Sequence, residues 1–166
     1  ILVTQRILES AKKMNNLKKI VMASSSSIYG NQEGIMNENS TLPKTISPYG
    51  ATKLASENLG YLYYENFGLP ITSLRYFTVY GPRQRPDMAF FKFIMANLSE
   101  KKIELFGDGS QKRDFTFISD IVEANIKTLE NNVEGEILNV GGGSVRSIKE
   151  VLDIISRETG KKNKII

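Results

Sequence analysis

A tyrosine and a lysine spaced four residues apart are the first residues in this sequence that could do acid–base chemistry. Tyr49 and Lys53 stand in the segment Tyr-Gly-Ala-Thr-Lys, and residues with this spacing share one face of a helix. An ammonium group beside a phenol favours the phenolate form. The pair therefore predicts a general base that acts near neutral pH, although the same spacing is also common on surface helices.

A run of four serines, Ser24 to Ser27, directly follows an apolar segment at 19–23 that is typical of a buried parallel strand. Ligands of open parallel sheets bind at the carboxyl ends of the strands. The serine hydroxyls are thus placed to meet a substrate, whereas a serine run considered alone favours a flexible loop.

The composition removes several other kinds of site. The 166 residues include no histidine and no cysteine, which excludes Ser-His-Asp and Cys-His catalysis, disulfides and the usual zinc sites. Proton transfer near neutral pH must then use Tyr, Lys, Asp or Glu, and we expect no metal.

Charge and hydropathy bear on partners and location. The formal net charge of +4 comes largely from lysine pairs, which lack the interleaved aromatic residues of a nucleic-acid surface. No stretch approaches the roughly 18 apolar residues of a membrane span, and the apolar start gives way at once to polar residues, unlike a signal peptide. We expect a cytoplasmic protein without nucleic-acid or membrane partners.

Apolar periodicity and breaker residues predict alternating helices and strands. Expected helices span 3–14, 49–66, 88–98, 120–129 and 148–159, and expected strands span 19–23, 71–76, 103–106, 115–118 and 137–140. Residues 24–48 are expected to form a long polar loop. Ser147 and Glu150 have the spacing of a capping box. The alternation predicts an α/β fold with a mainly parallel sheet.

Several motifs in a fixed order carry a closer resemblance. The serine loop is followed by Pro48-Tyr49-x-x-x-Lys53 and by a strand ending in Leu-Arg-Tyr-Phe-Thr-Val-Tyr-Gly-Pro at 74–82. Further segments are Arg-Gln-Arg-Pro-Asp-Met-Ala at 83–89, Phe-Gly-Asp-Gly at 106–109, Arg-Asp-Phe-Thr-Phe-Ile-Ser-Asp-Ile at 113–121 and Asn-Val-Gly at 139–141. This order closely resembles the nucleotide-sugar epimerases of the extended short-chain dehydrogenase/reductase family over essentially the whole chain. The segment at 83–89 resembles UDP-glucuronate 4-epimerases and some UDP-glucose 4-epimerases.

The resemblance implies part of a doubly wound parallel, Rossmann-like sheet together with a small α/β substrate-binding domain. Residues 1–80 and 115–130 would belong to the NAD-binding domain, and residues 82–112 and 133–166 to the nucleotide-sugar-binding domain. The resemblance also implies a homodimer in the complete protein, formed through helices that include the one starting at Tyr49.

Carried over position by position, the resemblance implies three catalytic residues. Tyr49 would take the proton of the sugar 4-hydroxyl, Lys53 would bind the nicotinamide ribose and favour the phenolate, and Ser25 would hydrogen-bond the reacting hydroxyl. The residues expected beside NAD are Ser24, Tyr49, Lys53, Tyr76 and Phe77. The residues expected beside the UDP-sugar are Ser25, Thr78, Arg85, Asp87, Met88, Phe106 and Arg113, of which Arg113 would contact the pyrophosphate.

The residues that follow Ser25 narrow the implied reaction. Dehydratases of the family carry Asp-Glu after the catalytic threonine, and decarboxylating relatives carry glutamate at the position of Ser27, whereas this sequence has Ser26 and Ser27. NAD-dependent 4-epimerisation through a 4-keto sugar needs only tyrosine, lysine, serine and a tightly held NAD. The sugar stays open between UDP-glucose/UDP-galactose and UDP-glucuronate/UDP-galacturonate, and Arg85 favours the uronate because it could meet a C6 carboxylate.

The glycine-rich Gly-x-x-Gly-x-x-Gly turn with which this family holds the cofactor pyrophosphate is not in the sequence. We therefore expect a fragment that alone binds NAD poorly and turns over little or nothing, with a hydrophobic sheet edge and face exposed. Two other interpretations remain. One is a non-catalytic nucleotide-sugar-binding protein on the same fold. The other, suggested only by a sequence pI of about 9.2, is a nucleic-acid-binding relative.

Overall fold

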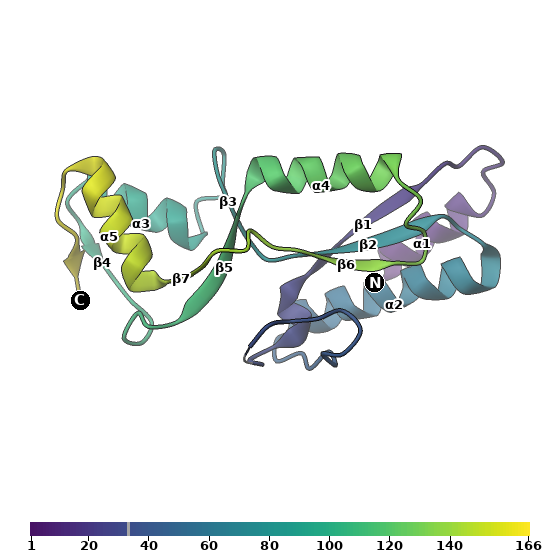
Figure 1. The fold of residues 1–166 in the computed structure, drawn as a ribbon, viewed down its shortest axis with the longest axis horizontal. Helices are drawn as coiled ribbons and strands as arrows, with labels where there is room; N and C mark the ends of the chain where they lie inside the picture. Colours follow the sequence, from purple (N-terminus) through teal and green to yellow (C-terminus); the bar gives the residue numbers. More distant parts are fainter. Residues whose placement is uncertain (33) are drawn as a thin grey trace. The chain divides into compact units, whose positions relative to one another are not determined.

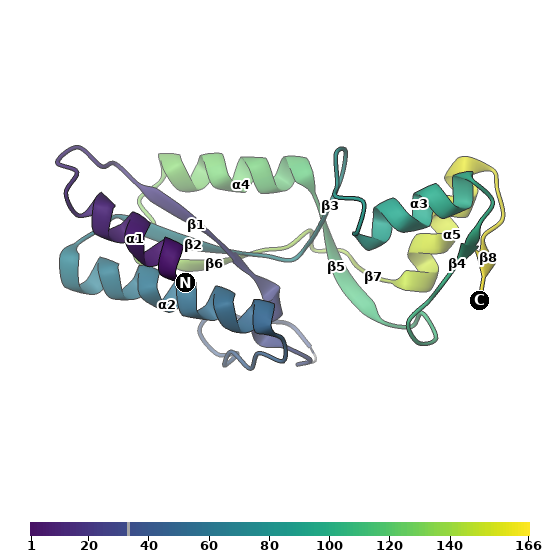
Figure 2. The ribbon, with the colours of Figure 1, turned by 180° about the vertical axis from the view of Figure 1, so that it is seen from behind.

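The computed structural model describes residues 1–32 and 34–166, which form two compact units (Figure 1 and Figure 2). Unit 1 comprises Ile1–Phe77 and Ser119–Gly141, and unit 2 comprises Thr78–Ile118 and Gly142–Ile166. The helices are α1 (Leu2–Ala11), α2 (Pro48–Phe67), α3 (Ala89–Leu98), α4 (Ile118–Glu130) and α5 (Ile148–Thr159), with a 3-10 helix η1 (Ser26–Tyr29). The strands are β1 (Ile20–Ser25), β2 (Ile71–Tyr76), β3 (Thr78–Tyr80), β4 (Lys102–Ile103), β5 (Lys112–Phe117), β6 (Ile137–Val140), β7 (Val145–Ser147) and β8 (Lys164–Ile165).

The sheet of unit 1 is parallel, with strand order β1-β2-β6. Helices α1 and α2 cover one face of this sheet and α4 covers the other, as Figure 1 and Figure 2 both show. Parallel strands between two helix layers form the arrangement of a doubly wound, Rossmann-like fold. The predicted α/β class is thereby confirmed.

Helix α2, which carries Tyr49 and Lys53, begins and ends at residues suited to those positions. The Ser47 hydroxyl accepts a hydrogen bond from the Gly50 N–H at 3.0 Å, and Pro48 occupies the first turn, where its missing N–H costs nothing. Gly68 ends the helix with a φ of 64°, a left-handed conformation that glycine adopts without a steric penalty. The helix is held on the sheet by an apolar core of Leu8, Ala11, Tyr63, Leu69 and Ile71.

Unit 2 has a second, smaller set of strands and helices. Strand β5 pairs in parallel with β3 and antiparallel with β7, and β4 pairs in parallel with β8. Its core consists of Ile103 together with Val151, Leu152 and Ile155 of α5. The capping box predicted at the start of α5 is present, because the side chains of Ser147 and Glu150 each bond the other's backbone N–H.

Three boundaries differ from those expected from the sequence. Strand β6, expected among residues 133–166 of the substrate-binding part, pairs with β2 and so lies in unit 1. Strand β5, expected from residue 115 onward with the cofactor sheet, pairs with β3 and β7 in unit 2. The expected loop at 24–48 starts as regular structure, because its first residues complete β1 and form η1. For β1, β5 and β6 the pairing partner is distant in sequence, and local periodicity does not reveal it.

Candidate active site

The serine run lies at the carboxyl end of β1, where the sequence placed it. Ser24 and Ser25 are the last two residues of β1, and both are buried. The Ser25 hydroxyl caps η1: it accepts a hydrogen bond from the Ser27 N–H at 3.2 Å and donates to the Ser27 Oγ at 3.1 Å. The orientation of the Ser25 hydroxyl is therefore set by η1, not left to a flexible loop.

Tyr49 and Lys53 lie on the first turns of α2 and share one face of that helix. The Lys53 Nζ donates to the Ala23 carbonyl at 2.9 Å and lies 5.8 Å from the centroid of the Tyr49 ring. Because Ala23 immediately precedes Ser24, this bond ties α2 to the end of β1 that carries the serines. The Tyr49 side chain itself is exposed, so its hydroxyl is accessible to a ligand.

A close approach between α2 and η1 brings the two candidate catalytic segments together. A Cβ placed on Gly50 would lie 2.6 Å from the Ser27 carbonyl oxygen, closer than side-chain carbons approach backbone. Only glycine at this position lets the first turn of α2 pack directly against η1. The structure thus brings together the segments that carry Ser25, Tyr49 and Lys53 in unit 1.

The residues expected beside NAD lie at the same end of the sheet. Ser25 is in register with Tyr76, and the Phe77 N–H donates to the Val140 carbonyl at 3.1 Å. Burial raises the pKa of the Tyr76 phenol, although its hydrogen bond to the Asn125 Oδ1 acts in the opposite direction. The Tyr76 hydroxyl therefore stays protonated near neutral pH and donates to Asn125.

Ser24 has a polar atom that the described residues leave without a partner. Its residue is 5% exposed, and its hydroxyl makes no hydrogen bond within residues 1–32 and 34–166. A buried hydroxyl without a partner is unfavourable by about 1–3 kcal/mol in protein mutational data. A bound polar ligand at this end of the sheet would relieve that cost, which fits the expected cofactor position of Ser24.

Apart from Ser25, which lies in unit 1, the residues expected beside the UDP-sugar lie in unit 2. Arg85 donates to the Asp87 Oδ2 at 3.1 Å and contacts the Met88 sulfur at 3.6 Å, so these three side chains are brought together on an exposed surface. Thr78 begins β3 and is in register with Phe115. Phe106 and Arg113 stand apart from that group: Phe106 is 94% exposed, and the guanidinium of Arg113 bonds the Lys112 carbonyl.

Sequence reasoning missed a buried polar group next to the candidate catalytic residues. Arg75 of β2 pairs with Glu57 of α2, and the guanidinium also donates to the Tyr29 hydroxyl at 2.6 Å. A signal was available, since Glu57 follows Lys53 at the helical spacing of four and Arg75 stands between Leu74 and Tyr76 in a predicted strand. A charge in a buried strand requires a charged partner.

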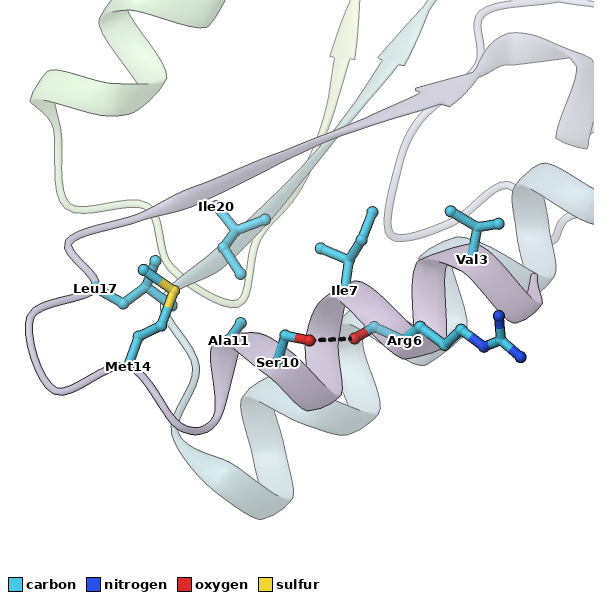
Figure 3. Close-up of a pocket in the computed structure, with 8 residues that line it drawn as sticks. All are labelled: Val3, Arg6, Ile7, Ser10, Ala11, Met14, Leu17 and Ile20. Carbon is cyan, nitrogen blue, oxygen red and sulfur yellow. Dashed lines mark hydrogen bonds between the residues drawn. The ribbon is translucent and has the colours of Figure 1, made fainter.

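A groove in unit 1, of about 540 Å³, lies elsewhere (Figure 3). None of the residues expected for catalysis lines it. Its lining comes from α1, the segment after it and the start of β1: Val3, Arg6, Ile7, Ser10, Ala11, Met14, Leu17 and Ile20. Several of its apolar side chains are exposed, including Val3, Ile7 and Met14.

Residues 1–32 and 34–166 hold no group of three or more His, Cys, Asp or Glu side chains that could bind a metal ion. Among those same residues, no helix combines the length and apolar character needed to cross a membrane.

Comparison with known proteins gives consistent matches. The pattern of the NAD dependent epimerase/dehydratase family matches residues 1–141. A UDP-glucuronate 4-epimerase from Thermodesulfobacterium geofontis (strain OPF15) is 46% identical over 162 residues, covering 97% of this chain and 50% of that protein. The uncharacterized UDP-glucose epimerase YtcB of Bacillus subtilis (strain 168) is 45% identical, covering 95% of this chain and 50% of that protein.

A solved structure shows the same relation. UDP-glucuronic acid 4-epimerase from Bacillus cereus, in complex with UDP-glucuronic acid and NAD, superimposes with a TM-score of 0.96 at 45% identity. The match covers 100% of this chain and 53% of that one. The chain therefore spans about half the length of the relatives it matches.

Proposed function

Because the chain belongs to the NAD dependent epimerase/dehydratase family, we propose that it carries the catalytic residues of a UDP-sugar 4-epimerase. The observation that supports this most is the joining of β1, η1 and α2, through which Ser25, Tyr49 and Lys53 occupy one end of unit 1. Unit 1 is proposed to belong to the NAD-binding domain and unit 2 to the nucleotide-sugar-binding domain.

The chemistry proposed for the chain's own residues is proton transfer and orientation. The exposed Tyr49 hydroxyl takes the proton of the sugar 4-hydroxyl and later returns it. Ser25 hydrogen-bonds the reacting oxygen, because η1 fixes its hydroxyl. NAD, when bound, supplies the acceptor and donor of hydride. Lys53 uses one N–H on Ala23 and keeps further donors for a ribose, while Ser24 supplies a buried hydroxyl.

The residues beside the candidate base favour epimerisation over the family's other reactions. Loss of water needs a carboxyl acid and a carboxylate base at the positions that Ser26 and Ser27 occupy. Hydroxyl groups there cannot serve in those roles near neutral pH. Inversion at the sugar C4 needs, besides bound NAD as the hydride carrier, only a group that takes and returns one proton, and Tyr49 can be that group.

The substrate that we propose is UDP-glucuronate, interconverted with UDP-galacturonate. The support is the exposed Arg85 guanidinium, a group that binds carboxylates in a bidentate fork, together with the names of the T. geofontis and B. cereus relatives. We assign the UDP-sugar to the following residues: Ser25, Thr78, Arg85, Asp87, Met88, Phe106 and Arg113. A homodimer of the complete protein is part of the same proposal, and the exposed Leu62 on α2 is suited to it.

A chimera tests the proposed function. This chain replaces the segment that it matches in the T. geofontis protein, and the product is incubated with NAD and either UDP-glucuronate or UDP-glucose. Sugar anomeric protons are followed by NMR. A galacto-configured product supports 4-epimerisation and identifies the sugar, whereas a folded chimera that makes no product from either sugar refutes the proposal. The 166-residue chain alone is expected to give no product and to bind NAD more weakly than micromolar by calorimetry.

A substitution at Arg85 tests the proposed sugar. Arg85→Leu in the chimera is expected to lower kcat/KM for UDP-glucuronate by about 10²-fold, since a bidentate charged contact is lost. Turnover of UDP-glucose, which has no carboxylate, should change by less than about threefold. The matched control is Arg83→Leu, an exposed arginine two residues away. Equal losses of kcat/KM for both sugars would show that Arg85 does not bind the carboxylate.

A further inference from the structure

The buried ion pair of unit 1 is formed by Arg75 and Glu57. Its hydrogen bonds reach beyond the two elements that carry these residues. The Arg75 Nε donates to the Glu57 Oε2 at 3.0 Å, and its NH2 group donates to the Oε1 at 2.6 Å. The two side chains are 4% and 1% exposed. The remaining NH1 group donates to the Tyr29 hydroxyl, which donates in turn to the Asn139 Oδ1 at 2.9 Å. One guanidinium of β2 thus joins α2, η1 and β6.

The elements joined by Arg75 are those that carry the candidate catalytic side chains. On α2, Glu57 follows Tyr49 and Lys53 at successive spacings of four, so the three lie along one face. Tyr29 is the last residue of η1, and the residue that caps η1 is Ser25. A shift of the guanidinium would therefore move both the helix of the base and the segment of the serine.

Stability alone does not account for a charged pair at this position. Replacing a buried ion pair by apolar residues of similar volume is often neutral or stabilising. Burial opposes the charge on Arg75, yet the hydrogen bonds that Arg75 donates to Glu57 and Tyr29, together with the charge of Glu57, hold its pKa above the ordinary value. Unlike an apolar contact, a bidentate pair of hydrogen bonds allows only one relative orientation of the two side chains, because both N–H···O bonds must align at once.

We propose that Arg75, held by Glu57, is a positioning residue that sets Ser25 relative to Tyr49 through the Tyr29 hydroxyl. This inference rests on the proposed epimerase function. Arg75 itself touches no reacting atom in the proposal; it acts through η1 and α2. Lysine cannot replace it, because an ammonium group lacks the planar fork that bonds both Glu57 oxygens and Tyr29.

The first test removes one hydroxyl in the chimera. Tyr29→Phe keeps the ring and the Glu57–Arg75 pair but cuts the link to η1 and is expected to lower kcat by about 10- to 100-fold, with KM changed by less than about twofold. The matched control is Tyr63→Phe, since Tyr63 is also a buried tyrosine of unit 1 and donates to Glu9, away from the catalytic segments. The control is expected to lower Tm by a similar amount and to leave kcat within about twofold. Equal kcat values for the two variants would overturn the proposal.

The second test uses the 166-residue chain and needs no catalytic activity. In NMR spectra of the labelled chain, Tyr29→Phe should shift the Ser25 and Ser27 amide resonances and the Tyr49 ring resonances, whereas Tyr63→Phe should leave them in place. Arg75→Lys should reproduce the Tyr29→Phe shifts. If the parent chimera is inactive but these shifts are present, the epimerase function is refuted and the positioning role is supported. Unshifted Ser25 and Tyr49 resonances would refute the positioning role whatever the chimera does.

Discussion

Replacing Tyr49 with phenylalanine is expected to lower the kcat of the chimera by about 10²- to 10⁴-fold, the range that a positioned general base contributes. Phenylalanine keeps the ring and removes only the proton acceptor, so KM should change by less than about twofold. The folding cost should be small, because Tyr49 is 55% exposed. Initial rates of anomeric-proton conversion measure the effect.

A second tyrosine on the same helix provides the control. Tyr61 is 51% exposed and lies on α2 three turns beyond Tyr49. Tyr61→Phe should therefore match any general effect of losing an exposed phenol and should leave kcat unchanged. A Tyr49→Phe chimera that keeps more than about a tenth of the parent kcat would mean that another group takes the proton. Histidine cannot be that group, since the chain has none.

Local sequence signals predicted the parts of the site that depend on residues close together in the sequence. The helix of Tyr49 and Lys53, its glycine stop and the capping box of α5 all follow from residues within a few positions of one another. The existence of β1 was predicted from the apolar segment at 19–23, although the strand ends two residues later than expected, at Ser25.

What the sequence did not reveal depends on contacts between distant residues. Tyr29 meets Arg75 across 46 positions, and the Tyr29 hydroxyl reaches Asn139 across 110. Neither periodicity nor propensity carries such pairings, which are set by the order of parallel strands in the sheet. The same limit explains why β6 was expected with the substrate-binding part although it pairs with β2.

The buried position of this ion pair also predicts a large effect on stability. Arg75→Met in the 166-residue chain removes the partner of Glu57 and leaves a carboxylate with 1% side-chain exposure inside unit 1. Uncompensated buried charges of this kind destabilise folded proteins by about 3–5 kcal/mol. The free energy of unfolding, measured by urea denaturation followed by circular dichroism, should fall by that amount. Arg157→Met serves as the control, because Arg157 pairs with Glu158 on an exposed surface and should change the value by less than about 1 kcal/mol.

The double variant Glu57→Leu/Arg75→Met separates the cost of an orphaned charge from the value of the pair. Two apolar side chains of similar volume should restore the free energy of unfolding to within about 1 kcal/mol of the parent. If both changes instead destabilise additively, the pair contributes to stability in its own right. A restored stability combined with a lowered kcat in the chimera is the outcome that we expect. The two carboxylate bonds and the Tyr29 bond of Arg75 would then serve the geometry between η1 and α2, a function that apolar packing of the same volume cannot perform.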